Sequence, residues 1–166
     1  QGVWKFENGD VAKGNFKMDL LDGYGTYTWS NGDKYEGQFK NGQKHGKGKY
    51  IEKNGYVYEG NWQNDERNGY GEYTYENNDK YSGLFKNNLR HGKGKYSYVN
   101  GNTYDGMWVK GFENGYGVFT WSDTDKYEGN WKDGWRTGKG KYFYESGTIY
   151  EGNFIDNIAE GKGTIT

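Results

Sequence analysis

Few residues of the chain have the types and spacing that catalysis or metal binding requires. Only two histidines occur, His45 and His91, each followed by glycine in the same repeating context, and there is no cysteine. A metal site or a histidine-based catalytic centre therefore has little support. Gly-x-Gly pairs recur, but they lie inside strand patterns with no helix start behind them, so they are not phosphate-cradling loops. The sequence predicts a chain that is not an enzyme and that uses no cofactor.

Lysine pairs could bind an anionic partner. A Lys-x-Lys pair recurs every 46 residues, and in the intervening repeats its first position is tyrosine. The strand pattern places these positions on the face opposite the aromatic residues. The candidate residues for acidic phospholipid are Lys47, Lys49, Lys93, Lys95, Lys139 and Lys141. Alternatively, glutamates such as Glu36 and Glu59 on neighbouring strands pair with the lysines and cancel their field.

Apolar residues at predicted loop tips could bind a protein. The segment between the two predicted strands of a repeat carries Leu20 and Leu21 in one repeat, and Ile158 in another. Such side chains could form a partner site, or they could fold back over a thin core. Trp135 is the preferred anchor because tryptophan beside arginine is a common hot-spot composition. The candidate partner-binding residues are Trp135, Arg136, Phe112, Leu89, Trp29 and Trp121.

The elements that position these residues follow from a strict period of 23 residues. Tyr-x-Gly recurs with this spacing at Tyr35, Tyr58, Tyr81, Tyr104, Tyr127 and Tyr150. Within a repeat, YEGQFK and KGKYIE both alternate with period two, which predicts two strands. Glycine at three fixed positions per repeat disfavours helix. The Asn54-Gly55 pair near the end of the repeat is a strong turn signal, so each repeat is predicted to be a β-hairpin, and a second turn links it to the next.

The aromatic stripe is predicted to form the core, in preference to a platform that binds a ligand. Glycine inside the strands leaves a bare trough across which the rings can lie. The expected fold is all-β, an elongated, single-layer, twisted antiparallel sheet of consecutive 23-residue hairpins. The expected structural residues are Tyr35, Gly37, Gly48, Tyr58, Gly60, Trp62, Gly71, Tyr81, Tyr104, Trp108, Tyr127, Gly129 and Trp131. A single array is expected over 1–166, with a partial repeat 1–11, repeats 12–34, 35–57, 58–80, 81–103, 104–126 and 127–149, and a partial repeat 150–166.

Composition limits the possible functions. Only 31% of the chain is hydrophobic, yet it holds 18 Tyr, 8 Phe and 7 Trp, which indicates an ordered but thin structure. The net charge of −1 provides no basic field for nucleic acid, so no nucleic-acid partner is expected. The absence of cysteine and of a signal-peptide pattern favours a cytoplasmic protein, and any membrane role is expected to be peripheral.

The unit YEGNWKDGWRTGKGKYFYESGTI, residues 127–149, resembles the MORN repeat (membrane occupation and recognition nexus), and the resemblance spans nearly the whole chain. The first repeat departs from the pattern, with Ala12 for tyrosine. The resemblance implies a scaffold, often at membranes or the cytoskeleton, that binds protein partners or dimerises; acidic phospholipid binding has also been proposed for the family. Such arrays also occur fused to enzymes, and the Asn-rich, Pro-free composition suggests a protist cytoskeletal or membrane-associated protein.

The leading hypothesis is therefore a non-catalytic scaffold that binds an extended or helical segment of another protein, or a second copy of itself. The alternatives are peripheral binding to acidic phospholipid headgroups and a regulatory or targeting module of a larger enzyme. Carbohydrate binding is disfavoured because no secretion signal is found.

Overall fold

The computed structural model describes residues 2–166. All of its regular structure is β-strand, which confirms the predicted all-β class of consecutive antiparallel hairpins. Gln1, which belongs to the predicted partial repeat 1–11, lies outside the described residues. The chain divides into two compact units, residues 2–78 with 85–88, and residues 79–84 with 89–166. Strand β8 (Lys80–Lys86) contributes residues to both units.

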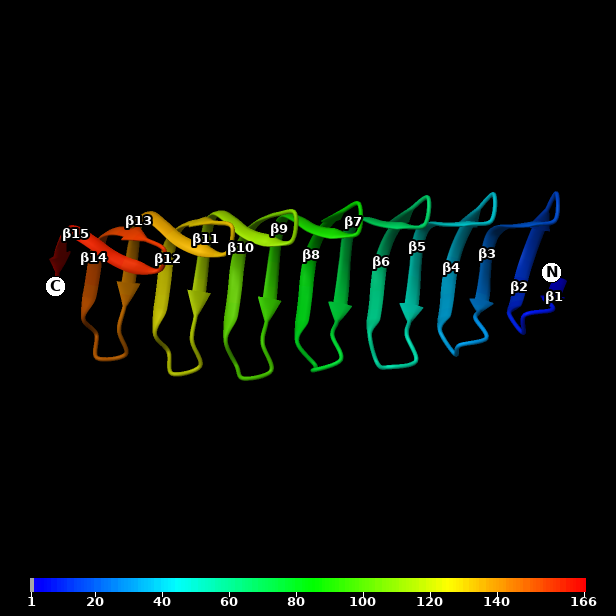
Figure 1. The fold of residues 1–166 in the computed structure, drawn as a ribbon, viewed down its shortest axis with the longest axis horizontal. Coiled ribbons are helices and arrows are strands. Elements are labelled where there is room, and N and C mark those ends of the chain that lie inside the picture. The colour runs from blue at the N-terminus through cyan, green and yellow to red at the C-terminus, as the bar shows by residue number, and fades with distance from the viewer. Residues whose placement is uncertain (1) are drawn as a thin grey trace. The chain divides into compact units, whose positions relative to one another are not determined.

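In the first unit, each strand pairs antiparallel with the next strand along the chain. Its hairpins run from blue to green in Figure 1. Its strands are β1 (Gly2–Lys5), β2 (Val11–Lys17), β3 (Leu20–Thr28), β4 (Lys34–Lys40), β5 (Gln43–Ile51), β6 (Val57–Gln63) and β7 (Glu66–Thr74).

The second unit repeats this arrangement, again with neighbours in sequence paired antiparallel. Its strands are β9 (Leu89–Ser97), β10 (Thr103–Val109), β11 (Phe112–Thr120), β12 (Lys126–Lys132), β13 (Trp135–Phe143), β14 (Ile149–Ile155) and β15 (Ile158–Ile165). Because the regular structure of residues 2–166 is strand alone, no helix packs on the sheet of either unit.

The tight turn of each hairpin is not where the strongest sequence signal lies. Asn41 and Gly42, which join β4 to β5, both have positive φ, as a two-residue type I′ turn requires. At Asn54-Gly55 only the glycine has positive φ, and the turn is longer, with the Gly55 N–H donating to the Glu52 carbonyl. Both sites are turns, but the tight hairpin connection is at Asn41-Gly42.

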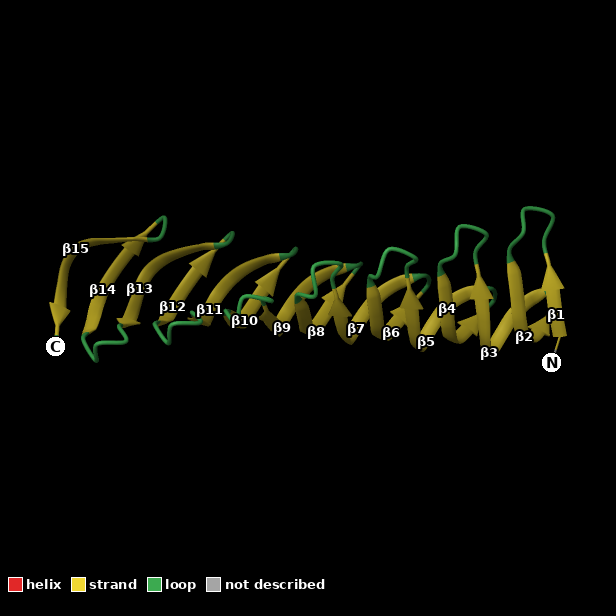
Figure 2. Ribbon diagram, turned by 90° about the horizontal axis from the view of Figure 1, so that it is seen from below, coloured by secondary structure: helices red, strands yellow, loops and turns green. Residues whose placement is uncertain are grey.

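The second strand of each hairpin begins earlier than predicted. Residues 43–46, read from the sequence as loop, belong to β5, and the register shifts by a β-bulge opposite Gln38. Gly46 lies in this bulge with φ of 61°, which breaks the alternation and so hid the start of the strand. The equivalent strands β11 and β13 curve along their length in Figure 2.

The core of each hairpin is a tyrosine ring laid across two glycines. Gly37 of β4 faces Gly48 of β5, and a Cβ on Gly48 would meet the Tyr35 ring and hydroxyl at 2.1 to 2.6 Å. Tyr35 is completely buried, and its hydroxyl donates to the Gln38 carbonyl at 3.0 Å. Phe39 meets the same ring edge-on at 5.0 Å. The same arrangement is built on Tyr58, Tyr81, Tyr104 and Tyr127, which are also buried.

Aspartates in the longer turns link consecutive hairpins. The Tyr27 hydroxyl donates to Asp10 Oδ2 at 2.7 Å, and the Ser30 N–H donates to Oδ1 at 2.8 Å. These bonds hold the pKa of Asp10 below its usual range, whereas burial, together with the bond to Asp10, raises the pKa of Tyr27 to about 12. Equivalent hydroxyl-to-carboxylate bonds join Tyr50 to Asp33, Tyr96 to Asp79 and Tyr142 to Asp125.

Candidate functional site

The aromatic face of each unit carries cations that the sequence patterns did not predict. The second residue of a nine-residue strand faces rings of its own and neighbouring hairpins, and we call the space between these rings the cation box. In the first unit, Lys44 Nζ lies 5.5 Å from the ring centre of Trp29, 5.2 Å from that of Tyr50 and 4.9 Å from that of Trp62. Burial lowers the pKa of Lys44, although Asp65 at 3.9 Å partly offsets this effect. The rings thus attract a largely desolvated cation.

Arginine occupies the same place in other hairpins of each unit. Arg90 Cζ lies 4.2 Å from the ring centre of Trp108 and 5.1 Å from that of Tyr96. The remaining arginine boxes consist of Arg67 with Tyr58, Tyr73 and Phe85, and of Arg136 with Trp121, Tyr127, Tyr142 and Phe154. The guanidinium group therefore fits a box built from the rings of adjacent hairpins.

Each boxed arginine also donates a hydrogen bond to the following tight turn. Arg90 Nη2 donates to the Gly111 carbonyl at 2.7 Å, and Arg136 Nη2 donates to the Asn157 carbonyl at 2.9 Å. In the opposite direction, the Gly111 and Asn157 N–H groups donate to the carbonyls of the boxed residues. The cation box is thus both a ring contact and a link between hairpins.

The opposite face carries the predicted lysines, and only some of them are paired. Lys49 Nζ lies 3.3 Å from Glu59 Oε2, and Lys141 Nζ lies 2.9 Å from Glu151 Oε2, which accepts its hydrogen bond and raises the pKa of Lys141. Among residues 2–166, no ion pair is formed by the other four predicted lysines, Lys47, Lys93, Lys95 and Lys139. The charge on this face is thus partly cancelled and partly available.

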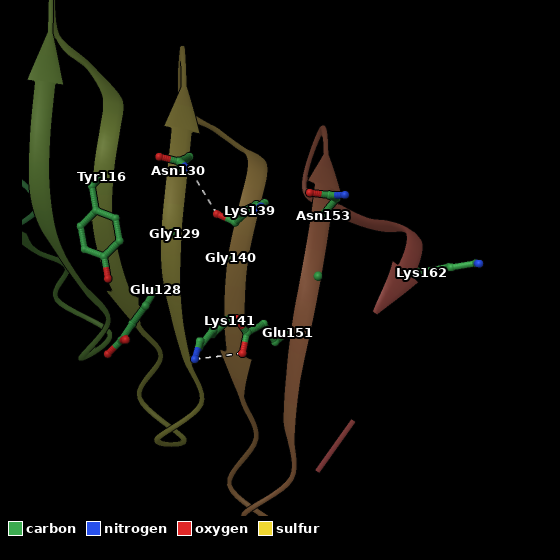
Figure 3. A pocket seen from close by; sticks show the side chains of 11 residues that line it. Tyr116, Glu128, Gly129, Asn130, Lys139, Gly140, Lys141, Glu151, Asn153 and Lys162 are labelled. Carbon is green, nitrogen blue, oxygen red and sulfur yellow. Dashed lines mark hydrogen bonds and ion pairs between the residues drawn. The ribbon is translucent and has the colours of Figure 1, made fainter. Parts of the chain in front are cut away.

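An open hollow of about 600 Å³ on this lysine face is lined by the unpaired Lys93 and Lys95 in the second unit, and two further open hollows lie on the same face. One of about 770 Å³ in the first unit is lined by Tyr24, Lys47 and Glu59 among others. The other, of about 460 Å³ in the second unit, is lined by residues that include Lys139 and Lys141 and is drawn in Figure 3. These last two hollows combine unpaired and paired lysines with acidic side chains, so neither is uniformly positive.

Exposed apolar side chains cluster beside the tight turns of the second unit. Trp135 is 53% exposed and Phe112 is 56% exposed, and both begin strands rather than occupying loop tips as predicted. Their position follows from the early start of the second strand. We call this cluster the turn-edge patch, which consists of Leu89, Val109, Phe112, Trp135, Ile155 and Ile158. The corresponding positions around the Asn41-Gly42 turn are polar, Lys40 and Gln43.

The other predicted anchors lie elsewhere. Because successive strand residues face opposite sides, Arg136 lies over the aromatic rings while its neighbour Trp135 is exposed on the other side. The proposed Trp-Arg pair therefore does not form one anchor. Trp121 and Trp29 are half-buried within the aromatic layer. Leu21 is buried and packs over the first glycine pair of the chain.

Neither a metal cluster nor a membrane-spanning helix is found in the part of the chain that the structure describes. No three His, Cys, Asp or Glu side chains come together there as a metal ion would need. None of residues 2–166 belongs to a helix that is long and apolar enough to cross a membrane. His45 is half-buried, and its Nδ1 atom has no hydrogen-bond partner among the described residues.

Comparison with known families agrees with this architecture. A family model described as MORN repeat matches residues 13–34, 35–55, 58–80, 81–103, 104–126, 127–149 and 150–166. No curated protein is similar enough in sequence to match the chain.

Solved structures match the chain with differing degrees of similarity. The SAS-4 (dCPAP) TCP domain of Drosophila melanogaster, in complex with a proline-rich motif of Ana2 (dSTIL), is similar in fold. This match has 15% identity and a TM-score of 0.54, and it covers 99% of this chain and 88% of that one. The TCP10 domain of Danio rerio CPAP, in complex with a peptide of Danio rerio STIL, matches with 10% identity and a TM-score of 0.31, covering 91% of this chain and 77% of that one.

Proposed function

Because this chain belongs to the MORN-repeat family, we propose that it is a non-catalytic scaffold. It binds a segment of a partner protein, or a second copy of itself, through the turn-edge patch. The proposed setting is cytoplasmic, at a membrane-associated cytoskeletal structure. The SAS-4 TCP domain, which is similar in fold, was solved in complex with a proline-rich motif, and this supports an extended protein segment as the ligand.

The turn-edge patch carries the proposal. Several large apolar side chains gather beside consecutive tight turns of one unit, and Ile158 is 68% exposed. Alternate strands of a sheet lie about 10 Å apart, so Phe112 and Trp135 can contact well-separated side chains of one bound segment. Of the equivalent first-unit positions, Gln43 and Glu66 are polar, so this apolar surface is not a general consequence of the repeat. A group of large exposed apolar side chains is typical of an interaction site.

Site-specific photo-crosslinking tests the proposal. A photoreactive phenylalanine analogue is placed at Trp135 or, as the matched control, at Gln43, which occupies the same position in the first unit. We expect covalent adducts with a protein partner, or with a second copy of the chain, from position 135 only. Analytical ultracentrifugation separates the two cases, because self-association depends on the concentration of the chain alone. Equal adducts from both positions, or none from position 135, would contradict the proposal.

Peripheral binding to acidic phospholipid is a second candidate. Lys47, Lys93 and Lys139 are exposed and form no ion pair within the described residues, and lysines near an anionic leaflet contribute about 1 kcal/mol each. Replacing all three with glutamate is expected to abolish sedimentation with phosphatidylserine vesicles at low salt. The matched control replaces Lys49 and Lys141, which already form ion pairs with glutamates, by glutamate in the same way. It is expected to weaken vesicle binding less than the triple variant does. Unchanged sedimentation of the triple variant rules this candidate out.

A further inference from the structure

At one cation box of the second unit, the strand position of the boxed arginines is occupied by an acid. Glu113 lies 23 residues after Arg90 and 23 residues before Arg136, in the same position of strand β11. Its Cα faces that of Trp108 across the hairpin, just as the Cα of Arg136 faces that of Trp131. The backbone therefore presents Glu113 to the aromatic face in the way that it presents the boxed arginines.

The carboxylate of Glu113 lies beside the next tight turn. Burial raises the pKa of Tyr104 and the charge of Glu113 adds to this effect, whereas burial raises the pKa of Tyr127 in the following hairpin and the charge of Arg136 opposes it. A Cβ built on Gly134 would lie 3.5 Å from Glu113 Oε2, which places the carboxylate beside the following tight turn. A Cβ built on Gly111, the equivalent position after Arg90, would meet nothing within 4 Å, so the Glu113 carboxylate lies at the edge of its box, beside the turn, rather than between the rings.

The rings of this box correspond to those around the boxed arginines. Tyr104 and Trp131 lie 5.2 Å apart in an edge-on arrangement, and Phe119 and Trp131 lie 6.2 Å apart. Tyr98, which is half-buried, lies 5.9 Å from Phe119. Each of these four residues stands 23 positions before one of the four rings that surround Arg136. The box is therefore built like one that holds a guanidinium group in this same chain.

The groups of the Glu113 box all favour a cation. A carboxylate cannot donate the hydrogen bond that Arg90 and Arg136 give to the next turn, where the equivalent carbonyl is that of Gly134. Aromatic faces repel an anion and attract a cation. Within residues 2–166, the Glu113 carboxylate has no ion-pair or hydrogen-bond partner. An unpartnered carboxylate therefore stands at the edge of a set of rings that lacks the cation of the sister boxes.

We infer that the Glu113 box binds the guanidinium group of an arginine side chain from a partner protein, in the place that Arg90 and Arg136 take in their own boxes. This inference rests on the proposed scaffold function and adds the chemistry of one partner residue. Arginine is favoured over lysine because its planar group can pair with the carboxylate through two hydrogen bonds while stacking on a ring. The boxes of Arg90 and Arg136 demonstrate that rings with this spacing accept that group.

A titration of the ¹⁵N-labelled full chain with a blocked Gly-Arg-Gly peptide tests the inference. The indole N–H of Trp131, which donates to the Gly117 carbonyl, gives a reporter beside the box. We expect its signal to shift saturably, while the indole signal of Trp62, whose box holds a cation of the chain itself, stays in place. The neutral isostere, a blocked Gly-citrulline-Gly peptide, is expected to bind at least about tenfold more weakly because the charge is lost.

Two variants separate the site from the fold. Glu113→Arg places a cation in the box, as in the sister hairpins, and is expected to abolish the response of Trp131 without unfolding the chain. Glu113→Gln keeps the shape of the side chain and is expected to weaken binding about tenfold. An unchanged response in Glu113→Arg, equal binding of the citrulline peptide, or no response of Trp131 overturns the inference. Tighter binding of a blocked Gly-Lys-Gly peptide overturns the choice of arginine.

The outcomes also separate this inference from the scaffold proposal. If position 135 crosslinks to a partner but Trp131 does not respond to the arginine peptide, the scaffold proposal stands and the assignment of the Glu113 box falls. If Trp131 responds as expected but position 135 crosslinks to nothing, the box binds guanidinium groups and the turn-edge patch is not the docking surface.

Discussion

Replacing Gly48 with alanine tests directly how the hairpins are held together. The added Cβ would lie 2.1 Å from the Tyr35 hydroxyl and 2.4 Å from Cζ, far inside any normal contact. The ring cannot retreat easily, because Phe39 and Trp62 meet it edge-on at 5.0 and 5.4 Å and its hydroxyl donates to the Gln38 carbonyl. Overpacking of this kind costs about 1 to 3 kcal/mol, and loss of the hydroxyl bond costs about 1 kcal/mol more.

Part of that cost is offset, because alanine is better than glycine in a strand by about 0.5 to 1 kcal/mol. The net expected loss in the free energy of unfolding is therefore about 1 to 3 kcal/mol, measured by urea denaturation followed by circular dichroism. The matched control is the same Gly48→Ala change in a Tyr35→Leu background, where it is expected to cost little because the ring that the Cβ meets is gone. A Gly48→Ala variant within about 0.5 kcal/mol of the parent, or an equal loss in both backgrounds, would refute this account of the core.

Three further variants test the links between hairpins. Arg90→Met removes the contact with Trp108 and the hydrogen bond to the Gly111 carbonyl, and it is expected to lower the free energy of unfolding by about 2 kcal/mol in urea denaturation. The control is Lys93→Met, on an exposed lysine without an ion pair. A loss no larger in Arg90→Met than in this control would count against the cation box as a structural link. The pKa of Asp10 is lowered in the folded chain, so its contribution to stability is present at pH values above the ordinary carboxyl pKa and is lost as the pH falls below about 4. Asp10→Asn should therefore flatten the acid limb of a plot of stability against pH. The pKa of Tyr27 is about 12 in the folded chain, above its value in the unfolded chain, so the contribution of Tyr27 to stability is present below about pH 10 and is lost between about pH 10 and 12. Tyr27→Phe should remove the ionisation near pH 12 from an alkaline titration followed by tyrosinate absorbance.

The fold was largely predictable because its cause is local and repeated. Tyrosine and glycine at fixed spacing favour the arrangement in which a large ring covers a bare strand pair, and the structure has that arrangement at Tyr35 and Gly48. The tight turn was harder to place because its residues vary. It reads Asn41-Gly42 in one hairpin and Met18-Asp19 in another, so its left-handed backbone is not marked by one residue pair. The bulge at Gly46 then disguised the first residues of the second strand as loop.

The cation boxes were missed for a different reason. In a strand pattern of period two, a lysine or arginine such as Lys44 or Arg67 is normally read as facing solvent. Only the positions of rings in the neighbouring hairpins show that the long side chain instead covers the aromatic face. The available signal was the recurrence of a basic residue in this position in four hairpins, Lys44, Arg67, Arg90 and Arg136. A repeat period reveals such a position, but the chemistry of the position depends on contacts between repeats.

Departures from the repeat differ in whether a neighbour compensates for them. Ala12 lacks the tyrosine ring, and Leu21 packs against the glycines that the ring would cover. Phe119 lacks the hydroxyl that other hairpins use, and the turn residue that would accept its bond is Asn102 rather than aspartate, so no carboxylate is left unpaired there.

Glu113 has no such compensation, because an acid replaces a cation while aromatic rings remain at all four equivalent positions, and about 0.5 to 2 kcal/mol of cation–π attraction is lost. In an array whose contacts run between neighbouring repeats, such a loss stays local and can be tolerated. An uncompensated departure is therefore the kind of position where this chain can bind something that its other hairpins cannot.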